Sequence, residues 1–360
     1  MRRRSQSSTP LKHLTCAATR ASWLKIILTS RPEADIRRFF DGLPQSSYLG
    51  YDLGTDQEAS GDLRTFARSE FELVARKQHL STPWPEEWLL DRIILRAHGL
   101  FIFIKTLVRA LEHRPNRTEF LEATSEEAGV GLKPLYGLYS NILNSRIVHS
   151  KDEFQRVIEV LLAAASHRAL CEEKIAELTG VKPNLVEMWV DELSSLLYRD
   201  EGTNRGIRVR HLSISEFLVS DDYPRDYRIN RQDANVQLGI SCLKTMVRQL
   251  PLNISPLEDS RLANADIKDP PSRITKNVPD CLQYSCLSWS NHLCFATDNN
   301  DQQVWDSLEK FFEGSSPLFW IEVLSILGMV PMGAPSIRRV ISWAKVSSAP
   351  ACISGNSDWQ

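Results

Sequence analysis

The chain has 360 residues, of which 24% are charged and 42% hydrophobic, enough for two or three domains that each have a core. Its formal net charge is −2, from 43 basic and 45 acidic residues, so no strong overall field attracts nucleic acid or an anionic membrane. The seven cysteines are odd in number and irregularly spaced, which indicates reduced thiols in an intracellular protein and excludes a disulfide framework.

We expect residues 1–22 to form a disordered or atypical N-terminus. Residues 1–32 hold seven basic side chains and no carboxylate. This composition is typical of an organelle transit peptide, an alternative that we keep beside a cytoplasmic location. The apolar runs are broken by charges before they reach the roughly 20 residues of a membrane span, so we expect no membrane partner.

The next segment predicts a strand, a helix and a second strand. Residues 23–28 are apolar on both faces, Pro32 suits a helix start, and residues 47–53 are apolar again before a turn. A strand that is apolar on both faces is normally covered on both sides in a parallel sheet. We therefore expect 23–60 to be the remnant of an α/β parallel sheet, with the two strands side by side and incompletely covered.

From residue 61 onward the periodicity is mainly helical. Residues 61–150 predict a helical domain, 224–345 a second helical region and 346–360 a disordered tail. Between them, 151–223 predicts a helix-turn-helix followed by a strand, which is the outline of a winged helix. The elements expected there are helices 154–166, 172–178 and 183–198 and a strand at 207–210.

Four stretches, in this order and at these separations, resemble the second half of the NACHT nucleotide-binding module of fungal STAND-type NTPases, the kind followed by WD repeats. They are LKIILTSRPEADI at 24–36, RAHGLFIFIKTLVRAL at 96–111, LYGLYSNIL at 135–143 and RHLSISEFLVS at 210–220. The likeness covers nearly the whole chain from Leu24 onward. It implies a mainly α fold with a remnant of an α/β parallel sheet: a partial NTPase domain, a helical domain, a winged helix and a C-terminal helical region.

The resemblance implies two nucleotide-binding residues. Arg31, at the end of the first expected strand, matches the sensor arginine that faces the terminal phosphate of ATP. His211 matches the winged-helix histidine that meets the β-phosphate of ADP. The alternative for Arg31 is an ion pair at a helix edge, and for His211 a satisfied structural role. If the geometry of the module is kept, the two side chains face one cleft.

The departures from the family are large. The chain contains no G-x-x-x-x-G-K-[ST] phosphate loop, and residues 1–22 contain no carboxylate that could hold Mg²⁺. We therefore expect no catalysis, no catalytic residue and no cofactor; ATP or ADP with Mg²⁺ belongs to a complete relative. The expected function is a truncated, non-catalytic regulatory or scaffold protein that contacts other proteins or itself. The alternative is a switch that binds ATP or ADP when its missing N-terminal half is supplied.

Two further types of site are disfavoured by the sequence. The spacing of Cys281, Cys286, His292 and Cys294 is not that of a zinc site and fits a helical pattern better, so we expect no metal. The helix expected at 183–198 carries Glu187, Asp191 and Glu192 where a DNA-reading helix needs positive charge, so we expect no nucleic-acid partner.

Overall fold

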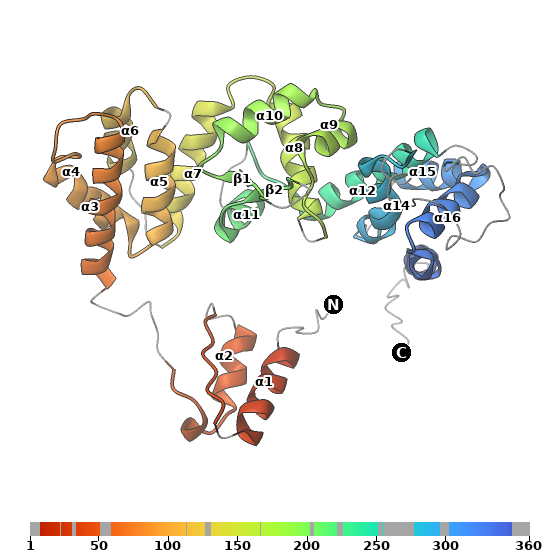
Figure 1. The fold of residues 1–360 in the computed structure, drawn as a ribbon, viewed down its shortest axis with the longest axis horizontal. Helices are drawn as coiled ribbons and strands as arrows, with labels where there is room; N and C mark the ends of the chain where they lie inside the picture. Colours follow the sequence, from red (N-terminus) through yellow and green to blue (C-terminus); the bar gives the residue numbers. More distant parts are fainter. Residues whose placement is uncertain are drawn as a thin grey trace, which may run out of the picture. The chain divides into compact units, whose positions relative to one another are not determined.

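The computed structural model divides the chain into two compact units, Met1–Ala59 and Ser60–Gln360, which are described separately (Figure 1). The structure describes residues 8–21, 23–30, 34–50, 59–112, 114–126, 131–165, 167–201, 205–221, 226–250, 254, 277–295 and 302–347. Within them the fold is mainly α, as the sequence predicted. None of the helices in these ranges is both long and apolar enough to cross a bilayer.

The first unit contains helices and irregular chain in its described part. Helix α1 (Ser8–Arg20) occupies most of the expected disordered N-terminus, and it is followed by α2 (Ala34–Asp41) and the short η1 (Gln45–Ser47). The strand expected at 23–28 is wrong, because these residues pair with no other segment that the structure describes and Ile27 is 93% exposed. A strand needs a partner for its backbone groups. Of the second expected strand, 48–50 are irregular and 51–53 lie outside the described residues.

The second unit begins with a group of helices that supports the site described below. They are α3 (Ala59–Lys77), α4 (Glu87–Ala97), α5 (Phe101–Glu112), α6 (Arg117–Glu126) and α7 (Lys133–Arg146). The chain leaves α4 through His98 and Gly99, both in the left-handed region, with φ of 44° and 77°. This conformation suits glycine and ends a helix. The turn allows α5 to start at once and bury its apolar face against α4 and α7.

Helices and a strand pair follow in the region that predicted a winged helix. The elements are α8 (Lys151–Ala164), α9 (Glu172–Thr179), α10 (Pro183–Glu192), β1 (Leu197–Arg199), β2 (Ile207–Val209) and α11 (Leu212–Val219). The strands are antiparallel, with Leu197 opposite Val209. In the described residues this pair is the only sheet, so the expected parallel remnant is not found. The winged-helix interpretation itself stays a prediction.

The helix expected at 183–198 is too long. It ends at Glu192, and residues 193–196 form a turn that leads into β1. Ser194 and Ser195 favour a turn over a helix interior. Leu197–Arg199 then gain backbone hydrogen bonds from β2, the next strand along the chain. Tertiary pairing therefore overrides the helical periodicity of this stretch.

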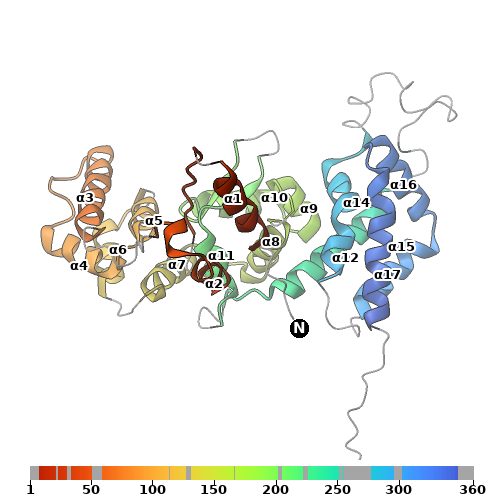
Figure 2. The ribbon, with the colours of Figure 1, turned by 90° about the horizontal axis from the view of Figure 1, so that it is seen from below.

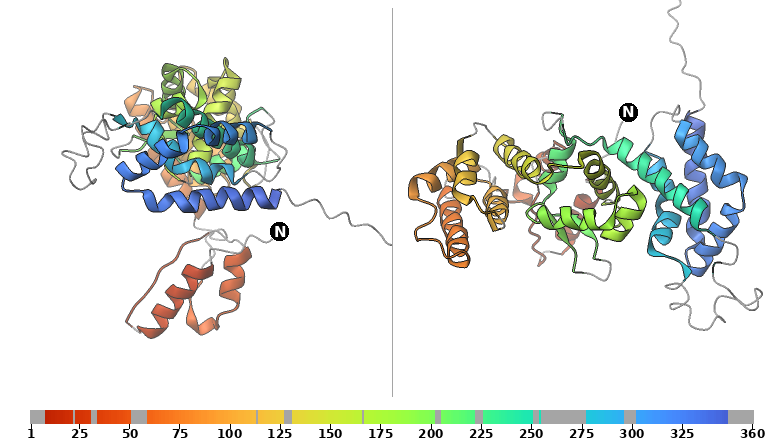
Figure 3. Two further views of the ribbon diagram at one scale, coloured as in Figure 1. Left: turned by 90° about the vertical axis from the view of Figure 1, so that its right-hand side faces the viewer. Right: turned by 90° about the horizontal axis from the view of Figure 1, so that it is seen from above.

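The C-terminal part is a bundle of helices. It comprises α12 (Arg231–Gln249), α14 (Asp280–Leu293), α15 (Gln302–Glu313), α16 (Ser316–Ile326), η3 (Val330–Met332) and α17 (Gly333–Ser347). Figures 2 and 3 show α12, α14, α15 and α17 packed side by side. At the centre the Trp289 ring lies 5.6 Å from Phe311 and 5.7 Å from Trp320. The expected tail lies outside the described residues, apart from the last two residues of α17.

Candidate functional site

His211 caps helix α11. It follows β2 with an extended backbone, φ −149°, and its Nδ1 accepts a hydrogen bond from the backbone N–H of Ser213 at 3.2 Å. The Oγ of Ser213 lies 2.6 Å from the same nitrogen. Helix N-termini leave backbone N–H groups without a partner inside the helix. His211 therefore has a structural role of the kind that serine or aspartate usually fills.

A hydrogen-bonded chain runs inward from this cap. The Ser213 hydroxyl lies 2.7 Å from the hydroxyl of Tyr139 on α7, and Tyr139 also hydrogen-bonds Thr106 on α5. Tyr139, Ser213 and Thr106 are all buried. Burial raises the pKa of Tyr139 to about 12, although the bonds from Ser213 and Thr106 oppose the shift. The chain therefore connects α5, α7 and α11 through neutral hydroxyl groups.

The direction of these bonds fixes the state of the imidazole. Because Nδ1 of His211 accepts from a backbone N–H, it carries no hydrogen in the neutral ring. The Ser213 hydroxyl can then donate to Nδ1 and accept from Tyr139. The ring proton is on Nε2, and His211 is half-buried. The ring thus caps α11 through Nδ1 while its N–H lies on the opposite nitrogen.

The partner expected for His211 cannot be placed beside it. Arg31 lies outside the described residues and belongs to the first unit, whereas His211 belongs to the second. The shared cleft of Arg31 and His211 therefore stays a prediction. Of the two candidate residues, the structure describes only the environment of His211.

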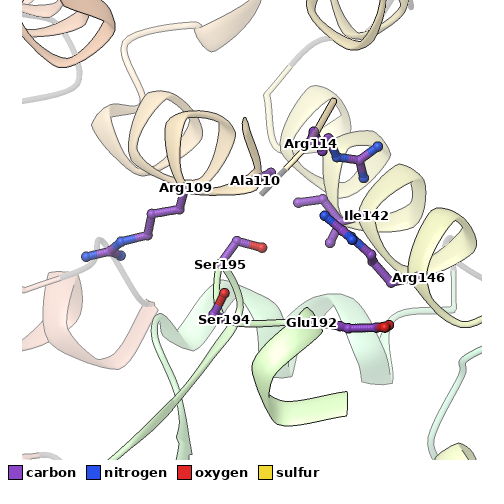
Figure 4. A pocket seen from close by; sticks show the side chains of 8 residues that line it. All are labelled: Arg109, Ala110, Arg114, Ile142, Arg146, Glu192, Ser194 and Ser195. Carbon is purple, nitrogen blue, oxygen red and sulfur yellow. The ribbon is translucent and has the colours of Figure 1, made fainter. Parts of the chain in front are cut away.

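Arg210, the residue just before His211, lies near further arginines that no sequence motif marks. Arg210 donates from Nε to the carbonyl oxygen of Ser194 at 2.6 Å, and its guanidinium lies 5.3 Å from the centre of the Tyr198 ring. Burial and then the charge of Arg109 lower the pKa of Arg210. Next to them is a pocket of about 10 Å³ (Figure 4). It is lined by Arg109, Ala110, Arg114, Ile142, Arg146, Glu192, Ser194 and Ser195.

Only a weak signal for this cluster is present in the sequence. Arg109 and Arg146 are basic residues in the last turns of α5 and α7, where a cation meets the negative end of the helix dipole. That position is common and needs no ligand to explain it. The turn at Ser194 and Ser195, which completes the pocket, was predicted as helix. The cluster is therefore a product of tertiary structure.

The chain was compared with known proteins at three levels. No family model matches it, and no solved structure matches it. It is 23% identical over 355 residues to the vegetative incompatibility protein HET-E-1 of Podospora anserina. The match covers 92% of this chain but only 25% of that relative, so the chain spans about a quarter of the relative's length. This distant similarity supports the resemblance to fungal NACHT-type proteins loosely.

His292, Cys281 and Cys286, whose spacing disfavours a zinc site, lie in the interior of the helical bundle. His292 is fully buried, its Nδ1 lies 2.9 Å from Oδ1 of Asn235, and its Nε2 lies 2.8 Å from the hydroxyl of Tyr284. Burial raises the thiol pKa values of Cys281 and Cys286, which keeps them protonated. In the described part of the chain no group of three or more His, Cys, Asp or Glu is arranged to hold a metal. His292 is part of the polar interior of the bundle.

Proposed function

We propose that the chain is a non-catalytic regulatory or scaffold module of a STAND-type signalling protein and that it acts through contacts with other proteins. The distant similarity to a vegetative incompatibility protein supports a signalling role. The proposal of no catalysis rests on the sequence, in which no G-x-x-x-x-G-K-[ST] string occurs. Without that loop and its lysine, phosphoryl transfer lacks the groups that hold and neutralise the phosphates.

The observation that carries the proposal is an exposed apolar face on α16 and η3. Leu318 and Ile321 on α16 are 67% and 49% exposed, and Val330 on η3 is 50% exposed. Helix α16 is apolar nearly all round, a composition typical of a buried helix, yet it buries only Trp320, Val323 and Leu324. Apolar surface of this kind marks a site of protein contact. We name it the α16–η3 face.

In a sample of the purified chain, the partner available to this face is a second copy of the chain. We expect the purified chain to self-associate as its concentration rises, as measured by light scattering after size-exclusion chromatography. The double variant Leu318→Glu/Ile321→Glu is expected to stay monomeric, because two carboxylates on the face oppose its burial. A matched control is Leu73→Glu, an exposed leucine on α3 in the helical group, which should leave self-association unchanged.

Two results would count against this part of the proposal. One is a chain that is monomeric at every concentration. The other is association that the α16–η3 variant retains in full while it stays folded by circular dichroism. Either result would rule out the α16–η3 face as a surface for self-association. The absence of a phosphate loop would then be the remaining support for the proposal.

A nucleotide-dependent switch is the second candidate function. The hydrogen-bonded chain from His211 through Ser213 to Tyr139 favours it, because a ligand that displaced the His211 ring would disturb α7 and α11 together. The switch requires a phosphate loop from a polypeptide that supplies the missing half. In such a reconstituted protein His211→Ala should weaken ADP more than ATP, by about tenfold or more for one charge-assisted contact. Equal effects on the two nucleotides would contradict the role of His211.

A further inference from the structure

The first unit, Met1–Ala59, holds an excess of positive charge that the overall charge of the chain conceals. Residues 1–50 contain nine basic and three acidic side chains, a net charge of +6, whereas residues 51–360 contain 34 and 42, a net charge of −8. The overall value of −2, from which we expected no attraction to an anionic membrane, is therefore an average of two unlike parts. A charge asymmetry of this kind indicates a polyanionic partner for the basic part.

Four of these cations are accessible at the surface of the first unit. They are Lys12 and Arg20 on α1, Lys25 in the segment that follows, and Arg37 on α2, and all four are exposed. None of them forms an ion pair with a residue that the structure describes. Surface cations without a partner keep their full attraction for an anionic surface, within the range that salt allows.

The segment between α1 and α2 presents large apolar side chains beside one of these cations. Trp23 is 81% exposed and Ile27 is 93% exposed, whereas Leu24 and Ile26 are half-buried. Exposure therefore alternates along the segment, and Trp23, Lys25 and Ile27 lie on its outer side. We name these three residues the 23–27 face.

The first unit offers no interior that covers this face. None of its residues that the structure describes is buried, and Leu28 and Leu49 are exposed as well, at 44% and 80%. Large apolar side chains left in water favour transfer to an apolar environment. Tryptophan is enriched at the boundary between lipid and water, and lysine keeps its charge in water while its stem lies along apolar surface. The 23–27 face therefore suits the surface of a bilayer.

The apolar side chains also decide which polyanion fits the basic unit. Sites for single-stranded nucleic acid combine cations with aromatic side chains, on which the bases stack. Here Ile27 is the most exposed of the large apolar side chains that the structure describes, and Leu28 and Leu49 are aliphatic too. Aliphatic side chains gain by entering the acyl boundary of a bilayer while cations meet anionic headgroups. This combination favours lipid over nucleic acid.

We infer that the first unit attaches the chain peripherally to an anionic bilayer, with Trp23 and Ile27 entering the interface and the four cations facing the headgroups. An attachment of this kind needs no membrane-spanning helix. The inference is independent of the proposed function, because it uses residues of the first unit, whereas the α16–η3 face belongs to the second.

Co-sedimentation of the full chain with lipid vesicles tests the inference. The probes are vesicles of phosphatidylcholine alone and vesicles that also contain about 30% phosphatidylserine, each at about 0.1 M and about 0.5 M sodium chloride. We expect binding to the anionic vesicles at low salt, weaker binding at high salt, and at least about tenfold weaker binding to the neutral vesicles. A sample without vesicles corrects for sedimentation caused by self-association.

Variants on the 23–27 face test each part of the interaction. Lys25→Glu should weaken binding to the anionic vesicles at least about tenfold, because it reverses a charge at the headgroups. The double variant Trp23→Ser/Ile27→Ser should weaken binding by a similar factor, because it removes the side chains that enter the interface. Matched controls in the second unit are Lys244→Glu, at an exposed lysine on α12, and Leu95→Ser, at a leucine on α4 that is 76% exposed. Both should bind as the parent does.

The results also separate this inference from the proposed function. The variant Leu318→Glu/Ile321→Glu should lose self-association and keep vesicle binding. The inference would be overturned by a chain that binds no vesicles or binds neutral and anionic vesicles equally, or by folded variants of the 23–27 face that bind in full. Tighter binding of a single-stranded oligonucleotide than of the anionic vesicles would assign the basic unit to nucleic acid and would overturn it too.

Discussion

Acidification should destabilise the C-terminal bundle through His292. Burial, with a smaller contribution from the charge of His167, lowers the pKa of His292 from 6.5 to about 3. The folded state therefore resists protonation, whereas the unfolded chain takes up a proton near pH 6.5. The stability contributed by the neutral ring is fully present above the unfolded pKa of 6.5, and it is lost progressively as the pH falls from 6.5 toward 3.

The loss of stability at pH 5 depends little on the pKa of His292 in the folded state, because the ring in the folded protein is still neutral at this pH. Between pH 7 and pH 5, protonation of His292 stabilises the unfolded state by about 1.4 kcal/mol for each pH unit below 6.5. The free energy of unfolding therefore falls by about 2 kcal/mol. The neutral ring fits its surroundings: Nδ1–H donates to Asn235, and Nε2 accepts from Tyr284. A second proton would have to replace the bond from Tyr284. The charge of His167 also opposes protonation of His292.

The assay is urea unfolding followed by circular dichroism at pH 7, 6 and 5, on the parent chain and on His292→Gln. Glutamine offers both a donor and an acceptor and does not titrate. We expect the variant to be less stable than the parent at pH 7. Between pH 7 and pH 5, however, its free energy of unfolding should fall by about 2 kcal/mol less than that of the parent. His149→Gln, at an exposed histidine, is the matched control. Parallel pH profiles of parent and His292→Gln would refute the reasoning.

Two further variants test the packing and the hydrogen-bonded chain. Gly239→Ala on α12 should destabilise the protein by about 1–3 kcal/mol, because the new Cβ would lie 2.7 Å from Cδ2 and 3.0 Å from the backbone nitrogen of Leu293. A thermal melt of the variant that matches that of the parent would contradict this close packing. Tyr139→Phe should lower the free energy of unfolding in urea by about 1–3 kcal/mol, because it removes a hydrogen bond from each of the buried Ser213 and Thr106 hydroxyls. An unchanged free energy of unfolding would show that the chain of hydroxyls adds no stability.

The sequence was most informative where local signals agreed with tertiary packing. The short helix expected at 172–178 appears as α9, ended by Gly180 with φ 71°, because glycine there suits the left-handed conformation that closes a helix. Within the helical domain expected at 61–150, the apolar stretch after Gly99 appears as α5, with most of its apolar side chains buried. In both places periodicity, capping and burial point to the same structure.

Prediction failed where an element depends on pairing with another segment. Residues 23–28 have the composition of a central strand, but a strand requires neighbours, and none is present among the described residues. Residues 193–199 continue a helical pattern, yet the partner strand β2 draws part of them into a hairpin. The fold class was predictable because it depends on many periodic patterns, and these two elements were not, because each depends on whether a partner strand pairs with it.

The candidate site divides in the same way. A family motif points to His211, but the role of this residue as the cap of α11 follows from the three-dimensional structure and not from the motif. The pocket arginines lie on separate helices and share no motif, so nothing in the sequence groups Arg109 with Arg146. Their grouping depends on how α5 and α7 pack, which the sequence pattern does not specify.

Magnesium-dependent ATP hydrolysis by the purified full chain tests the central claim most directly. The account predicts release of inorganic phosphate at the rate of buffer alone, because the sequence has no G-x-x-x-x-G-K-[ST] loop to hold the nucleotide and residues 1–22 have no carboxylate to hold Mg²⁺. Heat-denatured chain provides the background, and Arg31→Ala identifies any turnover that depends on the expected sensor. Steady phosphate release that Arg31→Ala abolishes would contradict a non-catalytic module and favour the nucleotide switch.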